Sequence, residues 1–204
     1  MATTVTRYVD PSSSGGNGTT NALSGANAAY ASLTAWNTAQ ATNLVTADQI
    51  HKVILCSNGG GTPAESANST TIQGWTTDLT RYIIIENEKP HGGVWNTGIH
   101  RFSGVANGHC LVVYGATTGT NNVKFVGLQI ESNITSSSGE YYGMLVYYQT
   151  GTQANTSFIF ERCIVKCNNN STTSRKMGIY ANTGGAGTAC RFFFSNLLWR
   201  KLEY

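Results

Sequence analysis

The sequence is poor in charged residues. Asp, Glu, Lys and Arg make up 11% of its 204 residues, and the formal net charge is +3. It contains no cluster of five or six basic residues, so the charge pattern of a nucleic-acid-binding protein is missing and we expect no nucleic-acid partner. Proline is also rare, with 3 residues against 23 glycines. Low charge with many Thr, Asn and Gly residues suits strands and turns better than helices.

The sequence gives no sign of export or of membrane insertion. Its first residues, MATTVTRYVDPSSSGGNGTTN, have no apolar segment behind a basic start, so they do not resemble a secretory signal peptide. A run of 18 apolar residues, which a membrane-spanning helix needs, does not occur. We therefore expect a protein that is made in a host cytoplasm and does not insert into a membrane.

Cysteine is limited to five residues, and no CxxC motif occurs. An odd number of cysteines without a secretory signal does not indicate a disulfide framework. Cys163 and Cys167 lie four residues apart with no histidine nearby, which is a poor spacing for zinc ligands. The thiols are therefore expected to be buried and to act as small hydrophobic side chains.

Recognisable catalytic motifs are missing as well, including GxSxG, HExxH, the P-loop and the dinucleotide fingerprint. Glycoside hydrolysis needs two carboxylates, and the nearest candidates are Glu86 with Glu88 or Glu86 with Glu131 in a neighbouring repeat. His91 and His100 flank GGVWNTG, but a third metal ligand is lacking. The sequence therefore predicts no cofactor and no metal, and it disfavours an enzyme.

What the chain does contain is a repeat of 34 to 35 residues. The segment VKFVGLQIES starts at Val123, FIFERCIVKC starts at Phe158, and FFFSNLLWRK starts at Phe192. Four positions stay apolar or thiol through both steps. They are Val123, Phe125, Leu128 and Ile130; then Phe158, Phe160, Cys163 and Val165; then Phe192, Phe194, Leu197 and Trp199.

Two further patterns accompany this repeat. Leu111 and Val113 are expected to step by 34 residues to Leu145 and Tyr147, and then by 34 to Ile179 and Ala181. A fourth, earlier copy is expected at IIIENE, with an insertion between Lys89 and Gly108. In that alignment Ile83, Ile85 and Glu86 match Leu128, Ile130 and Glu131, so that Glu86, Glu131, Lys166 and Arg200 form one outward column of charges.

A unit with two or three short strands cannot bury its own apolar face, but stacked units can. The repeat therefore predicts an all-β protein, a right-handed parallel β-helix with coils of about 34 residues. Connections between the strands are too short for helical crossovers, an antiparallel sandwich needs no fixed repeat, and a propeller blade takes four strands.

The predicted organisation has three parts. Residues 1–26 form a Gly/Ser-rich lead-in, in which Thr4 to Val9 is a possible strand. Residues 27–50 hold a capping helix, over 27–43 with Asn27 as N-cap, and a linker. Residues 51–204 form the coils, which continue or are capped by a partner at the C-terminal end.

Several segments resemble a known family. SLTAWNTAQATNLVTADQIHKVILC, TTIQGWTTDLTRYIII, GVWNTG and VKFVGLQI are similar to the N-terminal region of right-handed parallel β-helix repeat proteins from bacteriophages and metagenomes, over roughly residues 28–131. No catalytic motif of the family can be carried over. The resemblance implies a non-enzymatic structural or adhesive component of a virion, such as a head-decoration protein, a fibre or a tail-spike-like appendage.

Two sets of side chains are candidate contacts. Trp75, Trp95, Tyr142 and Tyr148 could stack on a cell-surface glycan or a partner. Phe194 and Trp199 belong to a repeat still in progress where the sequence stops, so we expect them at a subunit contact. The expected partners are other virion proteins and further copies of the chain, with a trimer favoured by family analogy. A polysaccharide-binding or polysaccharide-depolymerising β-helix protein and an extracellular filament subunit remain alternatives.

Overall fold

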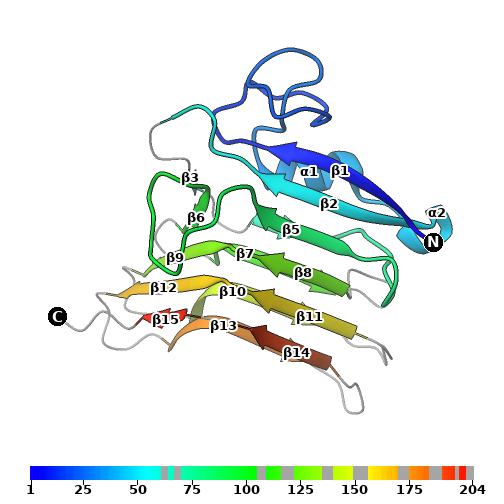
Figure 1. Ribbon diagram of the computed structural model, residues 1–204. Coiled ribbons are helices and arrows are strands. Elements are labelled where there is room, and N and C mark those ends of the chain that lie inside the picture. Colours follow the sequence, from blue (N-terminus) through cyan, green and yellow to red (C-terminus); the bar gives the residue numbers. More distant parts are fainter. Residues whose placement is uncertain are drawn as a thin grey trace.

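The computed structural model describes residues 1–60, 64–66, 70–104, 109–115, 122–134, 140–148, 156–169, 175–183, 190–195 and 198–200. The protein is mostly β, and its strands form three sheets in which all the pairs between described strands are parallel (Figure 1). From β2 onward the chain visits the three sheets in a fixed order and returns to the first sheet one strand further along. The expectation of an all-β parallel fold is confirmed.

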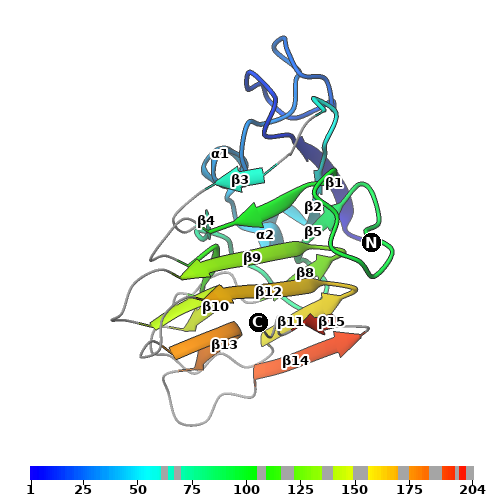
Figure 2. The ribbon, with the colours of Figure 1, turned by 90° about the vertical axis from the view of Figure 1, so that its left-hand side faces the viewer.

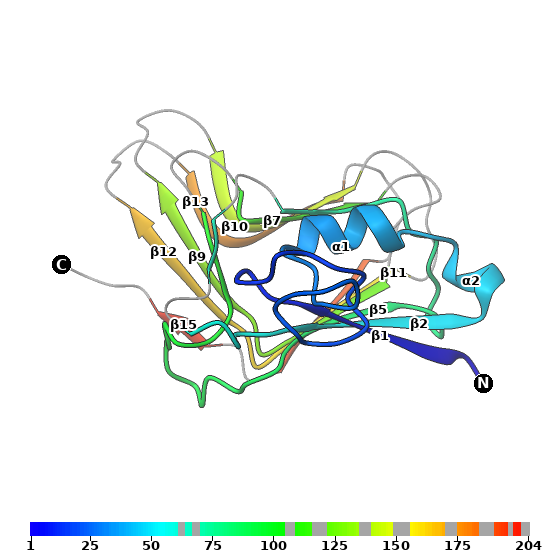
Figure 3. The ribbon, with the colours of Figure 1, turned by 90° about the horizontal axis from the view of Figure 1, so that it is seen from above.

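Each sheet receives its strands in the order of the chain. The first sheet contains β1 (Thr3–Val9), β2 (Gln49–Leu55), β5 (Ile83–Asn87), β8 (Asn122–Val126), β11 (Thr156–Glu161) and β14 (Cys190–Ser195). The second contains β3 (Ala64–Ser66), β6 (Arg101–Ser103), β9 (Gln129–Ile134), β12 (Ile164–Asn169) and β15 (Leu198–Arg200). The third contains β4 (Thr70–Ile72), β7 (Leu111–Gly115), β10 (Glu140–Tyr148) and β13 (Arg175–Thr183). Viewed from above, the sheets surround a common interior (Figure 3).

The main repeat is confirmed by the strand register. In the first sheet Val123 pairs with Phe158 and Phe125 pairs with Phe160, while in the second Ile130 pairs with Val165. The next step along the chain also holds in the backbone, where the partners are Phe192, Phe194 and Trp199. The rings of Phe125 and Phe160 are fully buried and stacked, with centroids 5.0 Å apart. Apolar side chains of successive passes thus stack on one another in the core.

The predicted register of the third sheet is wrong by one residue at β10. Leu111 pairs with Met144, not with Leu145, and Met144 pairs with Ile179. Because successive side chains of a strand point to opposite faces, this shift turns Met144 and Val146 into the core, where both are buried. Residues 144–146 are three apolar residues in a row, so the pattern alone does not specify which of them face inward.

The predicted position of the earliest copy is also wrong. Ile83 and Ile85 pair with Val123 and Phe125, a step of 40 residues in the first sheet, and not with β9 in the second. Glu86 therefore stands apart from the column of Glu131, Lys166 and Arg200, which is otherwise correct in the second sheet. Alternate apolar residues followed by glutamate occur both at Ile83, Ile85 and Glu86 and at Leu128, Ile130 and Glu131, which explains the error. The three-residue strands β3 and β6 are too short to show an alternating pattern.

The helix is shorter than predicted, and its N-cap is Ser32 instead of Asn27. Helix α1 (Leu33–Gln40) begins where the Ser32 side chain accepts a hydrogen bond from the Ala35 amide, and α2 (Leu44–Ala47) follows it. The residues before Ser32 cannot join the helix because they pair with β1: the Tyr30 amide donates to the Tyr8 carbonyl. The lead-in, residues 1–26, thus supplies β1 as an edge strand of the first sheet.

Helix α1 covers the interior at the β1 end of the stack, packed against β4 (Figure 3). Leu33 and Trp36 are fully buried, and the Trp36 ring stacks on Trp75 with centroids 5.1 Å apart. The Trp75 Nε1 donates to Asn37 Oδ1 at 2.7 Å, and the same oxygen accepts from the Gln73 amide at 3.2 Å. One helix therefore closes the apolar interior and satisfies polar groups beneath it, as a cap must.

A buried carboxylate fastens this cap to the second sheet. Both oxygens of Glu65 accept from the Leu33 amide, at 3.0 and 3.1 Å, in the first turn of α1. Glu65 Oε1 also lies 3.1 Å from His100 Nε2. Both side chains are buried, and a carboxylate at a helix N-terminus is favoured by the helix dipole. The contact joins three segments that lie far apart in the sequence.

Replacement of Trp36 by alanine tests the cap. Removing a fully buried indole leaves a cavity beside Trp75, so the free energy of unfolding is expected to fall by about 3–5 kcal/mol. Urea denaturation measures this value. The matched control is Thr38→Ala, on the exposed face of α1, with an expected change within about 0.5 kcal/mol. Equal, small effects of both substitutions would mean that α1 does not contribute to the core.

Candidate functional site

Two of the four predicted contact aromatics are buried instead, Trp75 in the central core and Tyr142 in a separate small cluster with Val112. Trp75 is fully buried between Trp36 and His51, so it cannot stack on a ligand. Tyr142 is buried too, because its ring lies between those of His109 and Tyr180, at 5.1 and 4.4 Å. For these two residues the prediction of a surface contact is wrong. The Tyr148 side chain lies outside the described residues, and so do the Phe194 and Trp199 side chains.

Trp95 is half-buried and lies in the segment 88–100, which connects β5 with β6. This segment overlaps the insertion predicted between Lys89 and Gly108, and it forms a loop beside the stack (green in Figures 1 and 2). Residues 101–103 of the predicted insertion form β6, and residues 105–108 lie outside the described residues. Lys166 Nζ lies 5.4 Å from the centroid of the Trp95 ring and 2.9 Å from Glu131 Oε1. The neighbouring Val94 is 58% exposed. Of the predicted contact residues, Trp95 alone has a described side chain at the surface.

The segment 88–100 is fixed to later strands by polar side chains. Gln129, at the start of β9, accepts from the Asn96 amide at 2.7 Å and donates to the Asn96 carbonyl at 2.9 Å. Asn87 donates to the carbonyls of His100 and Gly127, at 3.1 and 2.7 Å. Neither Gln129 nor Asn87 belongs to a recognisable motif. The only signal would have been an uncharged polar residue at a buried strand position.

His91 forms a third attachment. Its Nδ1 accepts from the Gly93 amide at 2.9 Å, so the ring proton is on Nε2, which donates to the Arg162 carbonyl at 2.6 Å. Arg162 has a positive φ of 54° in the turn between β11 and β12. The segment 88–100 therefore bridges from β5 to the β8–β9 and β11–β12 turns, which are the next two passes of the chain.

Between this segment and the two turns lies a groove of about 680 Å³. A cavity of this size is in the range of small-ligand sites. Its walls combine carboxylates, a guanidinium, an amide, an imidazole and apolar groups. The lining residues are Glu86, Asn87, Glu88, Pro90, His91, Gly92, Gly93, Val126, Gly127 and Arg162. We refer to it as the corner groove.

The charges at the corner groove are mostly paired. Glu86 forms an ion pair with Lys52 at 2.6 Å. Lys124, at 2.8 Å, holds the pKa of Glu161 below its usual value, and Arg162 Nη2 lies 3.4 Å from the same carboxylate. The hypothetical catalytic pair of Glu86 and Glu131 is not formed, since the two residues lie in different sheets and each contacts a lysine. Because most of these charged groups are held in ion pairs, the groove is better suited to binding a ligand than to transferring a proton.

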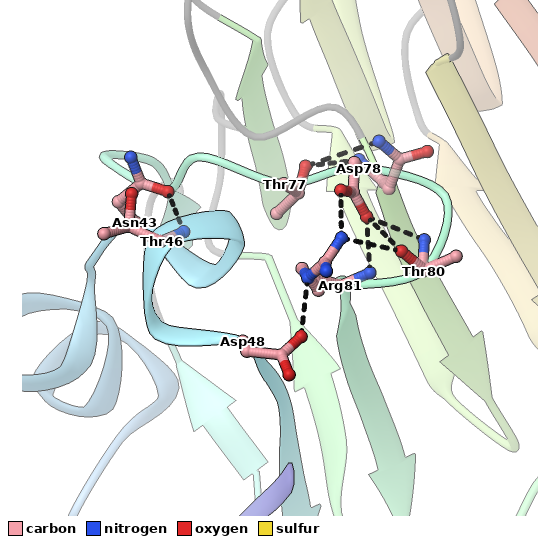
Figure 4. Close-up of polar contacts among 8 residues, drawn as sticks. Asn43, Thr46, Asp48, Thr77, Asp78, Thr80 and Arg81 are labelled. Carbon is pink, nitrogen blue, oxygen red and sulfur yellow. Dashed lines mark hydrogen bonds and ion pairs between the residues drawn. The ribbon is translucent and has the colours of Figure 1, made fainter. Parts of the chain in front are cut away.

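The polar residues of the TTDLTR segment, from Thr76 to Arg81, fasten a loop (Figure 4). Asp78 accepts from the amides of Thr80 and Arg81, at 2.8 and 2.7 Å, which lowers its pKa. The Arg81 guanidinium bridges Asp78 and Asp48, at 2.9 and 2.8 Å. Asp48 ends α2 in the left-handed conformation, so this cluster ties α2 to the turn before β5. The segment that carries part of the family resemblance thus has a structural role.

Other kinds of site are limited in the described part of the chain. Cys56, Cys110 and Cys163 are buried thiols outside any disulfide, as predicted, and the Cys110 thiol donates to the Glu131 carbonyl. Burial raises the pKa of Cys56 to about 12 and that of Cys163 to about 11. No group of three or more His, Cys, Asp and Glu residues in the described ranges is placed to hold a metal ion. None of the described helices has the length and apolar character required to cross a membrane.

Comparison with known proteins gives no relative. A scan against protein-family models, a search of curated proteins and a search of solved structures found no match to this chain.

One buried histidine makes the stability depend on pH. His51 lies in β2 against the edge of Trp75, with Nε2 3.2 Å from Gln49 Oε1. Burial, with a further effect of the Arg7 charge, lowers the pKa of His51 to about 4 from 6.5. The folded protein therefore resists protonation at a pH where the unfolded chain already binds a proton.

We expect this difference to destabilise the fold as the pH falls from about 6.5 to about 4, by up to about 3 kcal/mol. Above pH 6.5 the residue is neutral in both states and contributes no pH dependence. Urea unfolding at pH 7 and at about pH 4.5 measures the loss, and His51→Phe should reduce it. The same pH dependence in both proteins would show that His51 is not the group responsible.

Proposed function

We propose that the chain is a right-handed parallel β-helix and that it serves as a non-enzymatic structural and adhesive component of a bacteriophage virion. The observation that carries the proposal is the stacking of strands in all three sheets, with one strand per sheet in each pass. The hydrogen bonds of such a stack join residues far apart in the sequence, and buried side chains such as Phe125 and Phe160 pack on one another in its interior. These properties suit a rigid structural part.

The resemblance of residues 28–131 to phage and metagenomic β-helix repeat proteins supports the virion as the location. The fastened segment 88–100 supports an adhesive role. It presents Val94 and Trp95 at the surface on a backbone held by Gln129, Asn87 and His91. A contact surface on a rigid support loses little conformational entropy on binding. Binding to other virion proteins and self-association, with a trimer by family analogy, are parts of the same proposal.

A polysaccharide-binding protein is the second candidate, and the corner groove favours it. Cleavage of the polysaccharide has less support, because Glu86 is ion-paired with Lys52 and the distant Glu131 with Lys166. A retaining or inverting mechanism needs two carboxyl groups facing one bond.

Mass spectrometry of purified virions, together with immunogold electron microscopy, tests the location. The expected result is that the protein co-purifies with intact particles at a constant copy number and that gold label lies on the particle surface. Lysate depleted of particles serves as the control. A protein found in that lysate and never in particles would contradict the proposal. Release of reducing ends from host polysaccharide would instead support an enzyme.

A further inference from the structure

The turn that follows β2 contains an Asn–Gly pair whose reacting atoms are lightly held. Asn58 and Gly59 form this turn at the surface, and both are exposed. In the described part of the chain, the Gly59 amide donates to no acceptor. The Asn58 side chain makes one hydrogen bond among the same residues, from Nδ2 to the Asn21 carbonyl at 3.2 Å. The Gly59 nitrogen and the Asn58 Cγ are therefore available for a reaction with each other.

That reaction is deamidation through a cyclic succinimide. The Gly59 nitrogen forms a bond to the Asn58 Cγ, the bond between Cγ and Nδ2 breaks, and the Gly59 amide proton leaves with the departing ammonia. Glycine favours this step because it has no side chain to hinder its nitrogen. Water then opens the ring at either carbonyl and yields aspartate or isoaspartate, which has one extra methylene in the backbone. The reaction consumes only water and needs no oxidant or reductant.

A second Asn–Gly pair, in the lead-in, differs in both respects. Gly18 is buried, and its amide donates to the Ala28 carbonyl at 2.8 Å. The Asn17 Nδ2 donates to Asn27 Oδ1 at 2.9 Å. Its Oδ1 accepts from the amide and the hydroxyl of Thr19, at 3.1 and 2.8 Å. Attack at Asn17 would first have to break these hydrogen bonds, so the fold protects this pair while it leaves the other one open.

Asn58 also attaches the lead-in, whose loops lie at the top of Figure 1 (blue). Its amide donates to Asp10 Oδ2 at 2.7 Å, and the Ser12 amide donates to Asp10 Oδ1 at 2.9 Å. Asp10 is fully buried and forms no ion pair with any described residue, so its carboxylate depends on these hydrogen bonds. Gly59 lies close to the same loop, since a Cβ added to it would be 2.1 Å from the Ser12 Cβ.

We propose that Asn58 is a deamidation site in the folded protein, and that its conversion loosens the lead-in from the turn after β2. The product carries a carboxylate on the residue whose amide binds Asp10, and like charges repel each other. Loss of Nδ2 also removes the hydrogen bond to the Asn21 carbonyl. The extra methylene of isoaspartate displaces the turn that packs on Ser12. This modification site goes beyond the proposed function and does not depend on it.

Peptide mapping by mass spectrometry of the full chain, incubated at mildly alkaline pH, tests the reaction. Asn58 is expected to convert about tenfold or more faster than Asn17, because reaction at Asn17 requires the loss of several hydrogen bonds. In the urea-unfolded chain the two sites should react at similar rates, which isolates the effect of the fold. Equal rates in the folded protein, or faster conversion at Asn17, would overturn the proposal.

Hydrogen exchange of residues 10–26 tests the consequence. Exchange should be several-fold faster in the incubated protein and in Asn58→Asp, which carries the new carboxylate from the start. The matched control, Asn58→Gln, keeps a side-chain amide whose longer chain disfavours the five-membered ring, so its exchange should stay unchanged through the incubation. Thermal unfolding checks that the variants fold, and if Asn58→Asp does not, the converted wild-type protein separated by chromatography decides. Unchanged exchange in the folded aspartate form would contradict the loosening of the lead-in.

Discussion

The structure depends on the register of its parallel strands. Each residue of one pass lies beside its register partner in the next, about 4.8 Å away, so apolar side chains that face inward in one pass can pack directly on those of the next. Phe125 on Phe160 and Ile130 on Val165 are paired in this way in two different sheets. On the outer face the same register brings Lys166 to Glu131. A single-residue shift would place these charges toward the core.

Register alone leaves the first layer of the stack open, and two buried polar contacts allow a helix to close it. Glu65 holds the N-terminus of α1, and Asn37 holds Trp75 beneath it. Side-chain hydrogen bonds also hold the segment 88–100 outside the core. This loop has no strand pairing of its own, and the side chains of Gln129 and Asn87 bind its backbone and the neighbouring turn instead. The corner groove is a consequence of this attachment. Its walls come from both the segment 88–100 and the turns to which that segment is attached.

The sequence predicted the repeated elements better than the single ones. The register of Val123, Phe158 and Phe192 could be predicted because large apolar residues alternate along these strands. Only one alignment of the repeats places all of them in the core. The register of β10 could not be predicted, because Met144, Leu145 and Val146 are all apolar and the pattern does not show which of them face the core. Of the residues that line the corner groove, Glu86, Glu88 and His91 stood out in the sequence, but as candidates for catalysis or metal binding, and Trp95 lies on the same segment without lining the groove. Its shape comes from Gln129, Asn87 and His91, whose contacts join residues 33, 40 and 71 positions apart and leave no local pattern.

Cysteine cross-linking across successive passes tests the register most directly. Ile84 pairs with Lys124, Lys124 with Ile159, and Glu131 with Lys166, on outward positions of two sheets. Paired Cα atoms about 4.8 Å apart are within disulfide range. Cysteines at each pair should therefore cross-link within one molecule under mild oxidation, whereas cysteines replacing Ile84 and Glu161, two strands apart, should not. A folded protein in which the three pairs stay reduced, or in which the distant pair links as fast, would contradict the stacked arrangement.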